Sequence, residues 1–403
     1  MTARRYSHLL ADESELSRNG SRILVKPINV ERELSDPKHL SPRDAGLFVH
    51  RSYLLLLGWA VLMVGLACSE NQPPPENTDP AGRGTTAPYR VYVTNETSGD
   101  LTVIASGTHE IEATIPLGKR PRGITVAPDG TRLYVALSGS PPAPPGVDAS
   151  LLPPPDRSAD GIGVVDLATN QVTAMIYAGS DPEQLAVGTD GTRLYVANED
   201  ASEVSVVDIT SGDILARLPV GGEPEGVAIS PDGRFVYVTS EDDGNVSVID
   251  TGTNRVFAQF MVGARPRAAG FSPDGSRAYV TAENGNNVSV VDTTTHRVVD
   301  TITLSGENVR PMGVVVSPDG TRIYVTTGRG GTVVALDAAS GMPIDSVAVG
   351  ERPWGVALSP NGRYLYTANG PSNDVSVVDT DTLTVITKIA AGERPWGVAI
   401  VEP

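Results

Sequence analysis

One segment recurs seven times in this chain of 403 residues, and the repeat limits the fold more than any other feature. Each copy contains a tyrosine in a short alternating run such as RVYVTN, RLYVAN or RIYVTT, and four of the six intervals between them are 42 residues long. The tyrosines are Tyr92, Tyr134, Tyr195, Tyr237, Tyr279, Tyr324 and Tyr366. A fixed period of this length indicates a ring or stack of similar units.

Each unit contains four segments that are typical of β-strands. The tyrosine run is followed by an alternating segment such as VSVVD, then by one such as ILARLP, and finally by a proline-led segment such as PRGITV or PWGVAL. Period-two alternation between turn signals of the Ser-Pro-Asp-Gly kind favours antiparallel strands. The sequence therefore predicts an all-β, seven-bladed β-propeller with four antiparallel strands per blade, over residues 89–403.

The phase of the repeat predicts how the ring closes. The repeat begins on a tyrosine strand and ends on a proline-led strand at 395–401. We expect the proline-led strands to be innermost and the C-terminal strand to complete the blade of the N-terminal strands, which leaves no free sheet edge. The repeated tyrosines are predicted to pack between blades.

The recurring YVTN-like segments resemble the YVTN family of propeller repeats, found in bacterial and archaeal surface-layer and other exported proteins. The resemblance covers residues 89–403 and implies a fold, whereas propellers carry many unrelated functions. The fold also resembles the propeller subunits of quinoprotein amine dehydrogenases, the haem-binding propeller of cytochrome-type nitrite reductase, and propeller lactonases.

The chain before the repeat contains an apolar run at 53–67 that ends at Cys68. The run is short for a membrane span of ~20 residues and suits a signal peptide. We expect 1–48 to be a mis-annotated or disordered extension, 49–68 a signal peptide with a lipobox-like end, and 69–88 a Pro-rich tether. Cys68 resembles the lipidated cysteine of bacterial lipoproteins, with plain secretion as the alternative. The predicted location is periplasmic or on the cell surface.

Composition excludes several classes of function. A net charge of −17 argues against nucleic-acid binding, and a single cysteine argues against disulfide or thiolate-metal frameworks. Only His109 and His296 fall within the repeats, in turns that we expect to be exposed and far from the channel mouth. We therefore predict no catalytic residues and no cofactor. Calcium is a minor possibility at the acidic loops around 199–200 and 241–243.

The starts of the proline-led strands are expected to surround one mouth of the channel. The residues before each proline, together with two tryptophans on adjacent blades, are our candidate ligand-binding residues: Arg120, Asp181, Glu223, Arg265, Arg310, Arg352, Trp354, Arg394 and Trp396. The residues after each proline are Arg122, Glu183, Glu225, Arg267, Met312 and the same two tryptophans. Arginine beside an aromatic plane suits a carboxylate, carbohydrate or peptide ligand. The alternative is that arginine and glutamate pair around a solvated channel while tryptophan fills space.

One repeat is longer because of a Pro-rich insertion at about 140–161, which is expected on the mouth side. Such a segment is either a recognition surface or a tolerated insertion.

These observations favour a non-catalytic binding scaffold of the cell envelope, with its ligand at the channel mouth. The expected partners are a protein, a peptide or a cell-surface polysaccharide, with no nucleic acid, and with a membrane only through the lipid anchor. The alternative is a propeller enzyme or enzyme subunit of the quinoprotein dehydrogenase or lactonase type.

Overall fold

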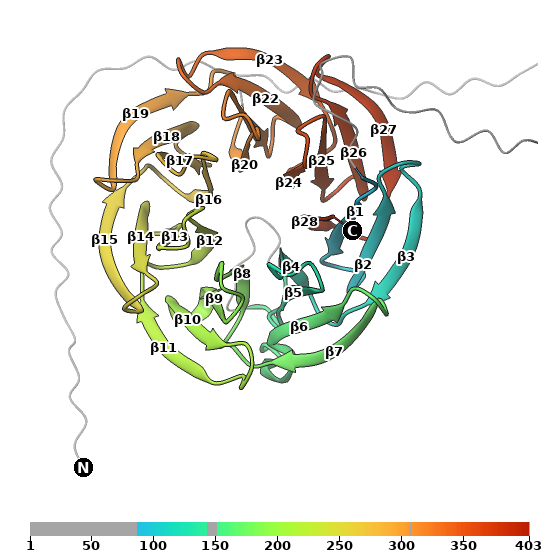
Figure 1. The fold of residues 1–403 in the computed structure, drawn as a ribbon, viewed down its shortest axis with the longest axis vertical. Helices are drawn as coiled ribbons and strands as arrows, with labels where there is room; N and C mark the ends of the chain where they lie inside the picture. Colours follow the sequence, from blue (N-terminus) through green and yellow to red (C-terminus); the bar gives the residue numbers. More distant parts are fainter. Residues whose placement is uncertain (1–86, 143–150, 307, 403) are drawn as a thin grey trace, which may run out of the picture. The chain divides into compact units, whose positions relative to one another are not determined.

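The computed structural model describes residues 87–142, 151–306 and 308–402. Within these residues the chain forms seven antiparallel sheets of four strands each, arranged around a central channel (Figure 1). The predicted seven-bladed propeller is therefore confirmed. The expected extension, the signal peptide with Cys68, and nearly all of the Pro-rich tether lie outside the described residues.

Each blade contains one strand of each of four kinds. The innermost strands are β4 (Pro121–Val126), β8 (Pro182–Val187), β12 (Pro224–Ile229), β16 (Pro266–Phe271), β20 (Pro311–Val316), β24 (Pro353–Leu358) and β28 (Pro395–Val401). The second strands are β1 (Arg90–Asn95), β5 (Arg132–Leu137), β9 (Arg193–Asn198), β13 (Phe235–Ser240), β17 (Arg277–Ala282), β21 (Arg322–Thr327) and β25 (Tyr364–Asn369). The third strands are β2 (Asp100–Ala105), β6 (Gly161–Asp166), β10 (Glu203–Asp208), β14 (Asn245–Asp250), β18 (Asn287–Asp292), β22 (Thr332–Asp337) and β26 (Asp374–Asp379). The outermost strands are β3 (Ile111–Pro116), β7 (Gln171–Ile176), β11 (Ile214–Pro219), β15 (Arg255–Met261), β19 (Arg297–Thr303), β23 (Pro343–Ala348) and β27 (Thr384–Ala390).

The ring closes through pairing between the two ends of the repeat region. β28 pairs antiparallel with β1, with Val401 opposite Arg90 and Val398 opposite Val93. In Figure 1 the red C-terminal strand lies beside the blue N-terminal strand in one blade. This confirms the predicted closure, which gives β1 a hydrogen-bonding partner on both sides.

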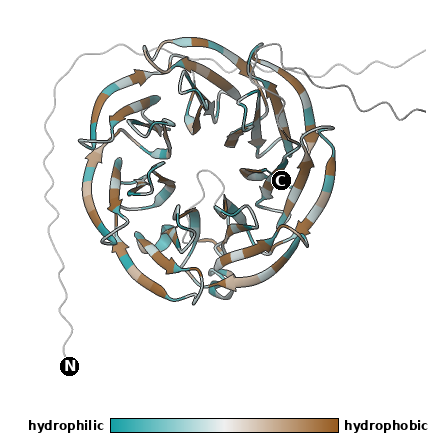
Figure 2. Cartoon of the chain, viewed as in Figure 1, coloured by the Kyte–Doolittle hydropathy of each residue, from teal (hydrophilic) through white to brown (hydrophobic). Residues whose placement is uncertain are grey.

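The hydrophobic core lies between neighbouring blades. All seven repeated tyrosines are buried, as predicted, and each packs against branched aliphatic residues. Tyr92 of β1, for example, packs with Leu133 and Val135 of β5 in the next blade. Figure 2 shows hydrophobic residues along the strands and hydrophilic residues in the turns. Burial of one strand face against the next blade thus fixes the ring and positions the innermost strands around the channel.

The described part of the Pro-rich insertion contains the short 3₁₀ helix η2 (Arg157–Ala159), and a second one, η3 (Glu199–Ala201), follows β9. No helix among the described residues is long and apolar enough to cross a membrane.

Candidate functional site

Every innermost strand has a β-bulge directly after its proline. In β4, Pro121 pairs with Leu137 and the next paired residue is Ile124, so that Arg122 and Gly123 are outside the ladder. The same shift occurs in the other six blades. A bulge frees a side chain from strand alternation and changes its direction. The residues after the prolines, except Trp354, are consequently buried in a ring at one end of the channel.

The residue before each proline has a left-handed backbone, with φ between 41° and 59°. In five blades its carbonyl accepts a hydrogen bond from the backbone N–H of the residue that follows the second strand, for example Glu199 N to Asp181 O at 3.0 Å. This contact brings a second set of side chains to the mouth. In four blades that residue is a glutamate: Glu96, Glu199, Glu241 and Glu283.

These side chains line a cavity of about 540 Å³, which we call the mouth. Eight of the nine candidate residues line it: Arg120, Asp181, Glu223, Arg265, Arg352, Trp354, Arg394 and Trp396. The ninth, Arg310, donates instead to the side chain of Asn284. Pro141, Pro142, Pro153 and Pro155 of the insertion also line the mouth, which agrees with the expected position of that segment.

Arg122 holds three carboxylates at one side of the mouth. Its guanidinium lies 2.6 Å from Asp181 and 3.1 Å from Glu199, and it also forms an ion pair with Glu183. Arg122, Asp181 and Glu183 are almost completely buried, whereas the side chain of Glu199 is 29% exposed. Burial acts to raise the pKa of Asp181, but Arg122, the hydroxyl of Ser138 and Arg120 together outweigh it, and the pKa lies below its ordinary value.

Arg267 is the centre of a second, similar cluster. It lies 2.8 Å from Glu225 and 2.7 Å from Glu283, and it also pairs with Glu241. Burial opposes the charge on Arg267, but these glutamates outweigh it and raise its pKa. Each cluster therefore surrounds one buried guanidinium with three carboxylates and carries an excess of negative charge.

The pKa of Glu199 is raised in this environment. Burial raises its pKa to about 7, and the neighbouring carboxylates of Asp181 and Glu225 add to the effect, while Arg122 opposes it. Glu199 therefore exchanges a proton near neutral pH, at a position partly open to the mouth. That is the property that a general acid or base needs.

The opposite side of the mouth is aromatic and cationic. The rings of Trp354 and Trp396 lie 5.7 Å apart at 30°, and the guanidinium of Arg352 lies 4.6 Å from the centre of the Trp354 ring. Burial lowers the pKa of Arg352, and the nearby Arg267 and Arg394 lower it further, against the effect of Glu283. A half-buried cation with other cations nearby favours an anionic or electron-rich group of a ligand.

Our selection from the sequence left out eleven of the charged residues at the mouth, and eight of these occupy two positions that recur in the repeat. Four follow the prolines: Arg122, Glu183, Glu225 and Arg267. Four follow the second strands: Glu96, Glu199, Glu241 and Glu283. The first set was visible beside the prolines, and the second could have been found by aligning the repeats after each tyrosine strand.

The expectation that both histidines are exposed is wrong. His296 is buried, with its Nδ1 2.7 Å from the hydroxyl of Tyr237, and His109 packs edge-on against Tyr364.

The acidic loops, where calcium was a minor possibility, form ion pairs with arginine: Glu241 pairs with Arg265 and Arg267. Among the described residues, no group of three or more His, Cys, Asp or Glu side chains could hold a metal ion.

The fold and the mouth define a seven-bladed propeller with a charged and aromatic channel opening. The family model described as "Lactonase, 7-bladed beta-propeller" matches residues 250–392, and the model of the cytochrome D1 heme domain matches residues 189–310. No curated protein sequence matches the chain.

Several solved structures are similar over the propeller. A candidate 6-phosphogluconolactonase of Bacteroides fragilis is 18% identical, with a TM-score of 0.66 over 82% of this chain and 100% of that one. The periplasmic gluconolactonase of Pseudomonas aeruginosa is 21% identical, with a TM-score of 0.63 over 79% and 100%. Hydrazine synthase of Kuenenia stuttgartiensis is 23% identical, with a TM-score of 0.62 over 72% and 92%.

The first of these comparisons overturns the expectation of a non-catalytic scaffold. The matching lactonase family model points instead to an enzymatic propeller, which was the alternative, while the solved structures show the shared fold. The raised pKa of Glu199 agrees with this correction, because the mouth contains a group that exchanges a proton near neutral pH.

The cytochrome D1 match raises the question of haem, which the residues at the channel do not fit. A haem-binding propeller needs an axial ligand at the channel, usually histidine. The two histidines in the described part of the chain pack against tyrosines, and of the residue types that ligate haem iron only the buried Met312 lines the mouth or the cavity below it. We therefore derive no step through haem.

Proposed function

We propose that this protein is a hydrolase of the propeller lactonase kind, which opens a cyclic ester at the channel mouth. The observation that carries the proposal is Glu199, a carboxyl group with a pKa raised to about 7 that lines the same cavity as Trp354 and Arg352. The lactonase family model over 250–392 supports the same class of reaction.

The reaction needs one group that takes a proton and returns it. The carboxylate of Glu199 accepts a proton from water while the water oxygen bonds to the carbonyl carbon of the lactone. The ring C–O bond then breaks, and the protonated Glu199 returns its proton to the released ring oxygen, which leaves a hydroxy acid. A pKa near the working pH makes both transfers efficient.

The remaining side chains of the mouth bind and orient the substrate. Arg352 supplies positive charge for the carbonyl oxygen, which becomes negative during the attack and ends in the product carboxylate. Trp354 and Trp396 offer flat surfaces for one face of the ring. Arg122 is a positioning residue, because its contact with Glu199 at 3.1 Å holds that carboxylate in place.

The test is a hydrolysis assay on the purified chain with glucono-δ-lactone, followed by alkali uptake at constant pH and corrected for spontaneous opening. We expect Glu199→Gln to lower kcat by about 10²–10⁴-fold. Trp354→Ala should instead raise KM. Glu110→Gln is the matched control, because Glu110 is exposed in the turn before β3. Full activity of Glu199→Gln would remove the proposed role, and no acceleration by the wild type over a lactone panel would remove the function.

We also propose that the protein is exported and anchored through an acyl chain on Cys68. The apolar run at 53–67 ends at Cys68, and the similar gluconolactonase of Pseudomonas aeruginosa is periplasmic. Labelled fatty acid should enter the wild-type chain and be absent from Cys68→Ser. Mass spectrometry that shows an unmodified Cys68 at a cleaved N-terminus would support plain secretion instead.

A further inference from the structure

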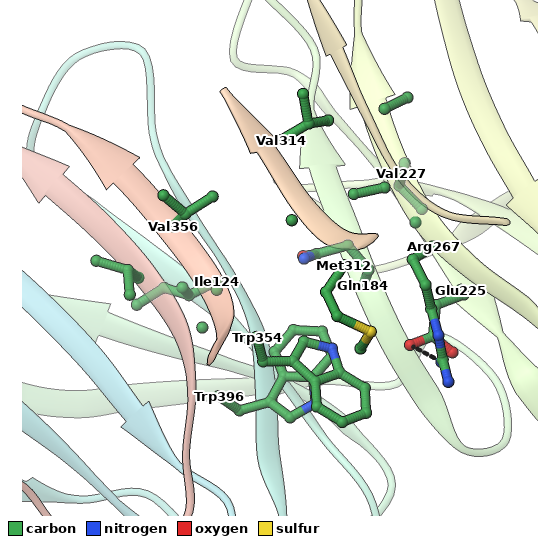
Figure 3. Close-up of a pocket in the computed structure, with 17 residues that line it drawn as sticks. Ile124, Gln184, Glu225, Val227, Arg267, Met312, Val314, Trp354, Val356 and Trp396 are labelled. Atoms are coloured by element: carbon green, nitrogen blue, oxygen red, sulfur yellow. Dashed lines mark ion pairs between the residues drawn. The ribbon is translucent and has the colours of Figure 1, made fainter. Parts of the chain in front are cut away.

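A separate cavity of about 170 Å³ lies within the channel, next to the mouth, and we call it the chamber. Glu225, Arg267, Trp354 and Trp396 line both cavities and so form the boundary between them. Figure 3 shows this boundary, with the two indole rings and Met312 on one side and the Arg267–Glu225 ion pair on the other. The mouth and the chamber therefore adjoin along the channel.

Beyond this boundary most of the side chains that line the chamber are apolar. The branched side chains of Ile124, Val227, Val314, Val356 and Val398 come from five different innermost strands, together with glycine and alanine. Gln184 adds the one uncharged polar side chain of the lining, and its Oε1 accepts a hydrogen bond from the backbone of Leu185. An alkyl group in this space would contact apolar side chains from several blades.

The wall combines small and branched residues for a structural reason. A Cβ at Gly226, Gly313 or Gly355 would lie 2.2–2.6 Å from a backbone oxygen of the neighbouring innermost strand. Glycine at these positions therefore lets the innermost strands lie close together around the chamber. Met312, which is unbranched and adaptable, is the lining residue best able to move as a ligand enters.

We propose that the chamber binds a short unbranched alkyl substituent of the substrate, so that this protein acts on alkyl-substituted lactones. The inference rests on the proposed function, because it places the lactone ring at the mouth between Glu199 and the tryptophans. The substituent passes the indole rings and enters the chamber. Trp354 and Trp396 line both cavities and therefore contact the lactone ring and its alkyl substituent at the same time.

The volume of the chamber limits the length of the alkyl substituent that it can hold. A dry cavity of about 150 Å³ holds one benzene molecule, so about 170 Å³ accommodates an alkyl group of about six carbons. Burial of each methylene changes affinity about fourfold. We therefore expect kcat/KM to rise about fourfold per added carbon and to stop rising near six carbons.

The first test measures hydrolysis of γ-butyrolactones with substituents from methyl to octyl, by the wild type and two variants. Ala269→Leu adds bulk to the chamber wall and should remove the dependence on chain length. Val356→Ala enlarges the chamber and should move the limit to longer chains. Ala339→Leu is the control, because Ala339 is exposed in the turn between β22 and β23, and it should behave as the wild type.

The second test needs no turnover and separates the chamber from the reaction. Benzene should raise the Tm of the full chain and of Ala339→Leu, and should leave the Tm of Ala269→Leu unchanged. Stabilisation by benzene without hydrolysis of any lactone would support the apolar site and reject the hydrolase. Hydrolysis with no effect of chain length, together with no effect of benzene on the wild type, would overturn the chamber proposal and leave the hydrolase standing.

Discussion

Glu199 differs from the other carboxylates around Arg122 in one respect, its access to solvent. Asp181 and Glu183 are buried against the guanidinium, while the Glu199 side chain is 29% exposed. Arg122 and the nearby Arg120 do not stabilise the three carboxylates equally, so the pKa of Glu199 is raised while that of Asp181 is lowered. The same imbalance that makes Glu199 a candidate base also makes its charge costly for the folded protein.

The free energy of unfolding should therefore depend on pH through Glu199. Its pKa is about 7 when folded, against 4.5 for an ordinary glutamate, so the folded chain holds more protons between these values. Stability then falls as pH rises from 4.5 to 7, and the loss is complete above about 7. Glu199→Gln should melt higher than the wild type at pH 8 and show a smaller decrease of Tm between pH 5 and 8.

Calorimetric melting of both proteins across this pH range measures the effect, with Glu110→Gln as the control. Parallel curves for Glu199→Gln and the wild type would show that Glu199 ionises normally.

The same residues show how far the sequence predicts the site. The repeat phase correctly placed the residues that flank each proline at one mouth, and eight of nine candidates line the cavity. The sequence did not reveal which side of the proline is buried, because the bulge interrupts the alternation from which strand faces are inferred. The pKa of Glu199 was also beyond prediction, since it depends on Arg122 and Asp181, which belong to other strands or blades.

At the scale of the strand, a threonine of the second strand links the bulges of two neighbouring innermost strands through hydrogen bonds. The hydroxyl of Thr94 donates to the carbonyl of Arg122 in the next blade at 2.7 Å and accepts from Gly397 N at 2.8 Å. Thr239 makes the equivalent contacts to Arg267 and Gly226. These bonds hold neighbouring innermost strands close together, which is why glycine is needed beside them.

Gly355→Ala should therefore be destabilising although alanine normally suits a strand better than glycine. Its Cβ would lie 2.3 Å from the backbone oxygen of Trp396, so β24 and β28 must move apart. We expect a loss of about 1–3 kcal/mol in the free energy of unfolding, measured by denaturant titration. Gly107→Ala is the matched control, because a Cβ there meets nothing within 4 Å, and it should change stability by less than about 0.5 kcal/mol.

Equal stability of the two alanine variants would show that the innermost strands separate freely.

At the scale of the strand, the sequence predicted the strands and their order well, because alternation and turn residues are local signals. It predicted the length of the Pro-rich insertion but not its 3₁₀ turn at Arg157–Ala159, or the contact of Arg157 with Asp200 in the next blade.

At the scale of the whole molecule, the ring closes through the blade that combines β28 with β1, β2 and β3. The C-terminal segment contributes the pairing of β28 with β1, the carbonyl of Arg394 just before β28, which accepts from Glu96 N at 2.9 Å, and the side chain of Trp396. Repeat phase alone was enough to predict this closure, because the number of strands at each end of the repeat region must add up to one blade.

Truncation before Arg394 should open the ring. The chain would lose β28, expose the edge of β1, and aggregate or unfold without a single cooperative transition. A chain that ends at Val401 retains all of β28 and is the control, which should melt as the full chain does. Calorimetry together with light scattering would measure both properties. A cooperative, monomeric transition in the shorter protein would show that six blades and three strands suffice.

The bulge after each proline has a consequence for how such a mouth changes during evolution. The side chain at that position lies outside the strand ladder, and the seven blades carry arginine, glutamate, methionine or tryptophan there. The side chain there can therefore change without altering the strand pairing, whereas Arg122 and Arg267 must change together with the carboxylates around them. Duplication of a repeat, as the identical 351–355 and 393–397 segments suggest, copies a ready-made part of the mouth. The chemistry of the mouth can thus change during evolution while the strand pairing of the propeller is kept.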